Sequence, residues 1–173
     1  GLVPGWWKKT LKEANRLSTF NARSEEVLQK PVFKSAFKRN RCVIPATGYF
    51  EWQEIPGDKN QPWYFTPRHT PIIAIAGIWD EWKNKETGET IKGCAMMTAA
   101  PNKFVEEMTH DRMPVILDQD EFEPWLTGKA GVEMCDPAPE DWLVKWRVSK
   151  LVNSSRADKH DDTLIDKIQL ETA

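Results

Sequence analysis

Four short polar segments of this sequence carry side chains that could do chemistry, and each interrupts an otherwise structural stretch. They are FNARSE at 20–25, GYFEW at 48–52, TAAPN at 98–102 and THDRMP at 109–114. A carboxylate such as Glu51 and an imidazole such as His110 suit proton transfer near neutral pH. The guanidinium forks of Arg23 and Arg112 suit phosphate oxygens. These residue types together indicate acid–base chemistry on a substrate that carries phosphates.

Each of these residues also has a simpler structural explanation. Asn21 could cap a helix beside a solvated Arg23, and Thr98 could cap the turn after a strand. Glu51 could stand in water at a strand end, and a single loop histidine such as His110 is usually a surface residue. Taken one at a time, the four segments leave both explanations open.

The strand expected over GYFEW gives Glu51 a particular setting. Side chains alternate along a strand, so Tyr49 and Glu51 share one face while Phe50 and Trp52 share the other. A carboxylate among so many aromatic rings could have a raised pKa and act as a general acid or base. The two histidines outside these segments, His69 and His160, lie in polar stretches and are expected to be exposed.

Composition limits the possible settings for this chemistry. A chain of 173 residues, 40% hydrophobic and 29% charged, suits one globular domain. No apolar run of about 18 residues is present, so no membrane span or membrane partner is expected. The three cysteines show no CxxC pairing and are expected to be buried thiols in a reducing compartment, with no disulfide, metal or cofactor. The formal net charge of −2 requires any nucleic-acid contact to come from a local basic face.

The elements that must position these residues are short. Gly1–Trp7 is expected to be a shaped loop. Helices are expected at 24–29, 32–39, 102–108 and 119–126, with Pro31 ending the first of them. Strands are expected at 42–44, 49–53, 63–65, 72–79, 92–97 and 142–152. This mixture without βαβ regularity predicts a single α+β domain with a largely antiparallel β-sheet core flanked by short helices.

The densest basic cluster of the sequence is Lys34, Lys38, Arg39 and Arg41. Its apolar partners Val32, Phe33, Ala36 and Phe37 recur at helical spacing on the other side of the same segment. We therefore expect the cluster to be a solvated helix face that contributes little to substrate recognition.

Six landmarks in a fixed order change the interpretation of the separate segments. GLVPGW, NARSE, RCVIPATGYFEW, TAAPN, HDRMPVIL and VSKLVNSSR run from the first residue almost to the last. Their order and spacing resemble the SOS-response-associated peptidase (SRAP) family, whose members attach covalently to abasic sites in single-stranded DNA. The resemblance implies one SRAP domain over residues 1–173. It also implies that the family's N-terminal segment, with its catalytic cysteine, precedes Gly1.

The chemistry that the resemblance implies uses a cysteine directly after the start methionine. Its α-amine condenses with the aldehyde of the ring-opened sugar to a Schiff base, and its thiol then closes a thiazolidine ring. An internal cysteine has no free amine, so Cys42, Cys94 and Cys135 cannot replace it. The resemblance also implies that the family members have a peptidase-like activity toward their own N-terminal propeptide.

The resemblance assigns roles to particular residues. Asn21 would position the terminal cysteine, and Glu51 would move protons during imine formation. His110 would assist opening of the sugar ring or stabilise the developing alcohol. The residues implied to contact DNA are Arg23 and Arg112 at the flanking phosphates, Pro4 and Trp6 as a wedge and stacking pair, Trp52 as a pocket wall, and Thr98 at the strand end. We expect Asn21, Arg23, Glu51, His110 and Arg112 to converge on one concave site.

The partner implied is single-stranded DNA that contains abasic sites, bound by a monomer in the cytoplasm near the nucleoid, or in the nucleus of a eukaryote. Three other functions stay open. One is a cysteine peptidase limited to self-processing. Another is a non-catalytic single-stranded DNA-binding module, which would show only reversible, salt-sensitive binding. A tryptophan-rich carbohydrate or small-ligand binder is the third, and it leaves NAR and HDRMP unexplained.

Overall fold

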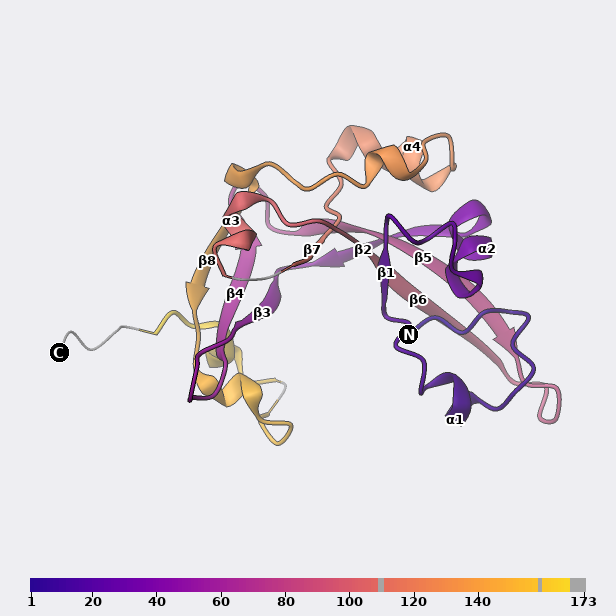
Figure 1. Cartoon of the computed structure of the whole chain (residues 1–173), viewed down its shortest axis with the longest axis horizontal. Helices are drawn as coiled ribbons and strands as arrows, with labels where there is room; N and C mark the ends of the chain where they lie inside the picture. The colour runs from indigo at the N-terminus through magenta and orange to yellow at the C-terminus, as the bar shows by residue number, and fades with distance from the viewer. Residues whose placement is uncertain (109–110, 159, 169–173) are drawn as a thin grey trace. The chain divides into compact units, whose positions relative to one another are not determined.

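The computed structural model describes residues 1–108, 111–158 and 160–168 and shows two compact units. Unit 1 comprises Gly1–Pro45, Ala74–Ala100 and Arg112–Ala138, and unit 2 comprises Ala46–Ile73, Pro101–Asp111 and Pro139–Ala173. Each unit is therefore assembled from three separate stretches of chain, and each contains its own β-sheet (Figure 1).

The sheet of unit 1 has five strands in the order β1-β6-β5-β2, with β7 pairing β6. The strands are β1 Asn21–Arg23, β2 Arg41–Ala46, β5 Ile73–Lys83, β6 Thr90–Ala99 and β7 Met113–Pro114. β5 and β6 form a long antiparallel hairpin, and β7 is antiparallel to β6. β1 runs parallel to β6. Figure 1 shows β1 beside the hairpin, and the N-terminus of the chain lies next to β1.

Helix α2, Pro31–Arg39, covers the core of unit 1. Phe33, Ala36 and Phe37 recur on one side of the helix and are buried there, as the spacing predicts. Pro31 begins α2 instead of ending a preceding helix. The first residue of a helix has no intrahelical acceptor for its N–H, so a proline there loses no hydrogen bond. The helix expected at 24–29 was therefore wrong, and those residues form consecutive turns.

The remaining helices of unit 1 are short. α1, Leu11–Ala14, begins at Thr10 with a capping box completed by Glu13. α4, Phe122–Leu126, follows a 3₁₀ turn at Gln119–Glu121 and supplies Trp125, which is fully buried. A further 3₁₀ turn lies at Val132–Met134.

Unit 2 is built on an antiparallel sheet in the order β3-β4-β8. Its strands are β3 Tyr49–Gln53, β4 Gln61–Pro67 and β8 Leu143–Arg147. Its one α-helix among the described residues is α3, Lys103–Glu106, capped by Asn102. Three 3₁₀ turns follow, at Glu140–Trp142, Lys150–Asn153 and Asp162–Ile165. The strand expected over 142–152 is therefore shorter than predicted. It ends at Arg147, and Ser149 caps the 3₁₀ turn that follows.

The fold class predicted from the sequence is confirmed, because antiparallel pairing dominates both sheets and the helices are few and short. The cysteines correct one expectation. All three are free thiols, but only Cys135 is buried, whereas Cys42 is partly buried and Cys94 is exposed. Within the described ranges, no helix is both long and apolar enough to cross a membrane.

Candidate functional site

The pairing of β1 with β6 gathers the polar residues of unit 1. Asn21 lies beside Met96, and Arg23 lies beside Thr98. The residues between them, Ala22 and Met97, are completely buried in the core. Side chains alternate along each strand, so Asn21, Arg23 and Thr98 lie on the face of the sheet that points away from this core. Two of the four polar segments thus meet, although they are about 75 residues apart in sequence.

Arg112 joins this group through contacts with Thr98 and Glu25. Its Nη2 donates to the Thr98 carbonyl at 2.5 Å and to the Thr98 hydroxyl at 3.2 Å. The guanidinium also forms a two-pronged ion pair with Glu25, with Nη1–Oε1 at 2.5 Å and Nη2–Oε2 at 2.9 Å. The side chain is only 19% exposed, so these acceptors hold it in one orientation. Thr98 acts here as an acceptor for Arg112 and not as a turn cap.

The charge of Arg112 affects its carboxylate partner. Its hydrogen bonds and positive charge hold the pKa of Glu25 below the usual range, and burial opposes this effect. The Arg112 Nε atom is buried and has no acceptor among the residues that the structure describes. One donor of this arginine therefore stays unused while the Nη atoms are engaged.

Glu51 lies at the centre of β3 in unit 2. Its neighbour across the sheet is Trp63 on β4, and Trp63 in turn lies beside Arg147 on β8. Tyr49 shares this face and stacks on Phe65, with ring centroids 5.0 Å apart. Burial, reinforced by the charge of Glu51, raises the pKa of Tyr49 far above its usual value, so the phenol stays protonated.

Trp63 and Arg147 are site candidates that sequence reasoning missed. The guanidinium carbon of Arg147 lies 5.2 Å from the centre of the Trp63 ring, at the distance of a cation–π contact. Nothing in the local sequence around KWRVS points to Glu51, because the two residues are joined only by strand pairing. The one signal in the sequence was that Arg147 is a basic residue within the strand expected over 142–152, where alternate side chains share a face.

Trp52 occupies the other face of β3, as the alternation predicts. Its indole nitrogen donates to the Asn153 side chain at 2.7 Å, and its ring lies near Phe50. Within unit 2, the tryptophan that shares a face with Glu51 is Trp63. The expectation that Trp52 forms the wall of a pocket stays a prediction, and Trp63 is a second candidate because it shares the face of Glu51.

In the loop Gly1–Trp7, the two residues expected to act as a wedge and stacking pair differ in their exposure to solvent. Pro4 is fully buried, so it can shape the loop but offers no surface to a base. Trp6 is 52% exposed and lies against Trp7, with ring centroids 6.2 Å apart. The Gly5 amide donates to Asp80 at 3.0 Å and attaches the loop to β5. Trp6 is therefore the side chain of this loop that can stack on a base.

The basic cluster of α2 is only partly solvated. Lys34, Lys38 and Arg39 are exposed as expected. Arg41 is different, because its guanidinium lies 4.1 Å from the centre of the Phe37 ring and 4.4 Å from that of Trp125. It also donates to the carbonyls of Phe37 and Ala130. Burial lowers the pKa of Arg41, which joins α2 to α4 as a structural residue rather than part of a solvated face.

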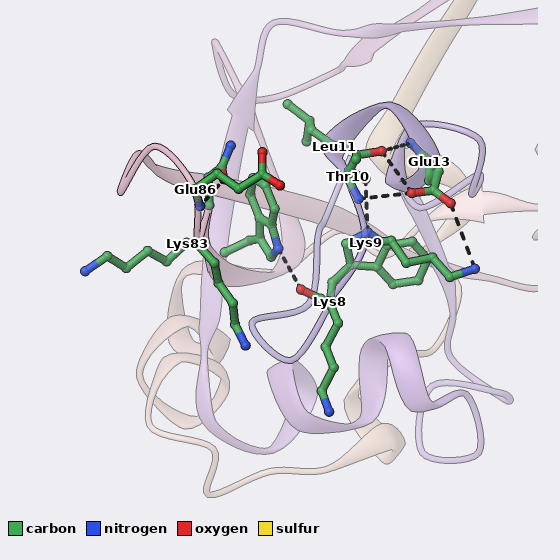
Figure 2. Close-up of a pocket in the computed structure, with 11 residues that line it drawn as sticks. Lys8, Lys9, Thr10, Leu11, Glu13, Lys83 and Glu86 are labelled. Atoms are coloured by element: carbon green, nitrogen blue, oxygen red, sulfur yellow. Dashed lines mark hydrogen bonds and ion pairs between the residues drawn. The ribbon is translucent and has the colours of Figure 1, made fainter.

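A second basic feature of unit 1 is a cleft of about 260 Å³ between the loop before α1 and the tip of the β5–β6 hairpin. Its lining includes Lys8, Lys9, Lys83 and Lys85, together with Glu13 and Glu86. Figure 2 shows Lys9 extending toward Glu13, with which it pairs at 4.0 Å, while Lys8 extends elsewhere. None of the site residues expected from the sequence lines this cleft.

The structure leaves part of the expected site untested. His110 lies outside the described residues, and Glu51 belongs to a different unit from Asn21, Arg23 and Arg112. Their convergence on one concave site therefore stays a prediction. His69 and His160 are exposed. Among the described residues, no group of three or more histidine, cysteine or acidic side chains could hold a metal ion.

Comparisons with known proteins relate the whole arrangement to one family. Residues 1–155 match the family model described as SOS response associated peptidase (SRAP). The abasic site processing protein YoaM of Bacillus subtilis is 32% identical over 161 residues, which cover 90% of this chain and 69% of YoaM. The abasic site processing protein HMCES of Xenopus tropicalis is 31% identical over 180 residues, 90% of this chain and 52% of HMCES.

Solved structures agree with these sequence matches. A crystal structure of a Bacteroides thetaiotaomicron protein superposes with a TM-score of 0.89 at 29% identity, covering 98% of this chain and 75% of the other. A Bordetella bronchiseptica protein superposes with a TM-score of 0.75 at 32% identity, covering 86% of this chain and 74% of the other.

Proposed function

This chain belongs to the SOS response associated peptidase family, and from that membership we propose that it recognises abasic sites in single-stranded DNA and becomes covalently attached to them. The relatives named abasic site processing proteins support the substrate class. The partner is the damaged DNA strand, bound by one copy of the chain in the compartment that holds the DNA.

The proposed reaction forms a thiazolidine between the protein and the sugar aldehyde. An amino-terminal cysteine, which is not among these 173 residues, attacks the aldehyde carbon with its α-amine. Loss of one water molecule leaves an imine. The thiolate then adds to the imine carbon, and the nitrogen takes up a proton. The product retains both reactants apart from the water that is released.

This chain's residues supply positioning and proton transfer in that scheme. Asn21 orients the terminal cysteine, Glu51 carries protons to and from the carbinolamine, and His110 assists opening of the sugar ring. The position of Glu51 at mid-strand supports its role, because a side chain on a rigid element can be held in a productive geometry.

The observation that carries the proposal is the group of Asn21, Arg23, Thr98 and Arg112 on one face of the unit 1 sheet. Two guanidinium groups beside an amide match a strand whose phosphates flank a small neutral lesion. Trp6 adds an exposed ring on which a base can stack, which is a common way of binding single strands. This combination accounts for DNA binding in a chain with a net charge of −2.

The test compares variants of protein that carries the amino-terminal cysteine, on single-stranded DNA with one abasic site. Glu51→Gln keeps the shape of the side chain but removes the proton carrier, so DNA affinity should hold while crosslinking slows by about 10²–10⁴-fold. Arg23→Ala should instead cost roughly 1–3 kcal/mol of binding. Crosslinks are counted on denaturing gels, and reduction with borohydride traps any imine.

The control is Glu54→Gln, which makes the same change at an exposed residue three positions along the chain. It should alter neither affinity nor rate. Normal crosslinking by Glu51→Gln, together with full affinity of Arg23→Ala, would contradict the assigned roles. A wild-type complex that dissociates under denaturing conditions would instead support a reversible DNA-binding module.

A further inference from the structure

One face of the unit 2 sheet carries a row of three side chains across its strands, next to the part of that face on which Phe104 of α3 packs. Glu51 on β3, Trp63 on β4 and Arg147 on β8 are neighbours in register. Directly opposite side chains in an antiparallel pair lie about 5 Å apart on the same face. With strands about 4.8 Å apart, Arg147 stands roughly 10 Å from Glu51, with the indole of Trp63 between them.

Two cations lie over the Trp63 ring, and they differ in their contacts. The Lys145 ammonium, 6.0 Å from the ring centre, pairs with Glu107 at 2.9 Å and also donates to the Phe104 carbonyl. Its side chain is 11% exposed. Lys145 therefore serves to hold α3 against the sheet.

Arg147 is half-buried and lies over the same ring. Within the described part of the chain, its guanidinium forms no ion pair and donates no hydrogen bond, so the contact with Trp63 is the interaction that orients it. The five N–H donors of an arginine lie in the plane of the group and point outward. A guanidinium positioned over an aromatic ring in this way is oriented before a ligand arrives, and its donors remain available.

We propose that Arg147, held over Trp63, binds a backbone phosphate of the DNA strand close to the nucleotide on which Glu51 acts. This inference rests on the proposed function, since it takes the strand to pass across the face that carries Glu51. An arginine fork binds two phosphate oxygens at once, and the contact is independent of base sequence. In this proposal Arg147 is a DNA-binding residue of unit 2, in addition to the arginines that unit 1 supplies.

The experiment combines protein variants with strands that lack a single charge. Arg147→Gln removes the charge, and Arg147→Lys keeps the charge but removes the fork. Lys59→Gln is the control, because it removes one exposed positive charge from the same unit. Each protein is tested on an abasic strand in which the phosphates around the lesion are replaced, one at a time, by an uncharged methylphosphonate.

Arg147→Gln should weaken binding roughly tenfold at low salt and lower the salt dependence by about 0.7 in log–log slope. Arg147→Lys should recover part of this loss. One methylphosphonate position should weaken wild-type binding but leave Arg147→Gln unaffected, because the variant no longer makes that contact. At saturating DNA the crosslinking rate of Arg147→Gln should fall less than its affinity does. The unfolding midpoint should fall by only about 1–4 °C, because the contact with Trp63 is lost.

Several results would overturn the proposal. Arg147→Gln could behave like Lys59→Gln, or lose the same affinity at every methylphosphonate position. A slower reaction at saturating DNA with unchanged affinity would mean that Arg147 acts on Glu51 rather than on phosphate, and a loss confined to one neighbouring base would make it a base reader. Failure of the proposed function would look different: wild-type protein would form no adduct that survives denaturation, whichever phosphate is replaced.

Discussion

Arg112 contacts both Glu25 and Thr98, and its ion pair with Glu25 makes the stability of the site dependent on pH. The pKa of Glu25 is lowered in the folded protein, mainly by its hydrogen bonds with Arg112. The folded state therefore binds this proton more weakly than the unfolded state does. The resulting stability is present above the unfolded pKa, near 4.3, and is lost as the pH falls through the lower folded pKa.

Glu25→Gln should consequently lower the Tm at pH 7 by roughly 1–4 °C, a small effect because the Glu25 side chain is about half exposed and solvent screens the pair. The difference from wild type should shrink as the pH drops below about 4. Circular dichroism melts at pH 7, 5 and 3 measure this directly. A difference in Tm that stays constant with pH would show that the ion pair is not its source.

At the scale of elements, the basic residues in and just after α2 have two different roles, one in solvent and one in packing. Lys34 and Lys38 point into solvent, whereas Arg41, just after the helix, is enclosed by Phe37 and Trp125. Exposed charges on a helix contribute to DNA affinity only through the general electrostatic field, which salt screens.

Changing both Lys34 and Lys38 to alanine should therefore weaken single-stranded DNA binding by only about two- to threefold at low salt, and not at all near 0.5 M salt. Fluorescence anisotropy with a labelled abasic strand is the measurement. Removal of the two ε-amines leaves the buried side of α2 intact, so the melting curve serves as the control. Complete loss of binding would place this helix face in the DNA site.

For the whole molecule, a net charge of −2 means that DNA affinity depends on a few placed cations. The contacts proposed for Arg23, Arg112 and Arg147 amount to about three phosphates, for which we expect a slope of log K against log salt on single strands of about −2. Titrations of a labelled abasic strand from 50 to 400 mM salt measure it. A slope steeper than about −4 would show that further cations bind, with the lysine-lined cleft of Figure 2 as the first place to search.

Much of this protein could be predicted from the sequence because the signals are local. Strand alternation in GYFEW places Glu51 and Trp52 on opposite faces, and the structure agrees. The apolar spacing of 32–39 predicts the buried face of α2. The six ordered landmarks predict the family, since they record residue types and spacing without reference to contacts. These patterns depend only on residues a few positions apart.

Tertiary structure decided which distant residues meet. β1 is three residues long, and only its parallel pairing with β6 brings Arg23 beside Thr98. The burial of Pro4 and the contact of Arg41 with Trp125 likewise depend on the tertiary fold. The row formed by Glu51, Trp63 and Arg147 requires three strands from separate parts of the chain. Such contacts depend on strand register and packing between distant segments, and no periodicity within a single segment records them.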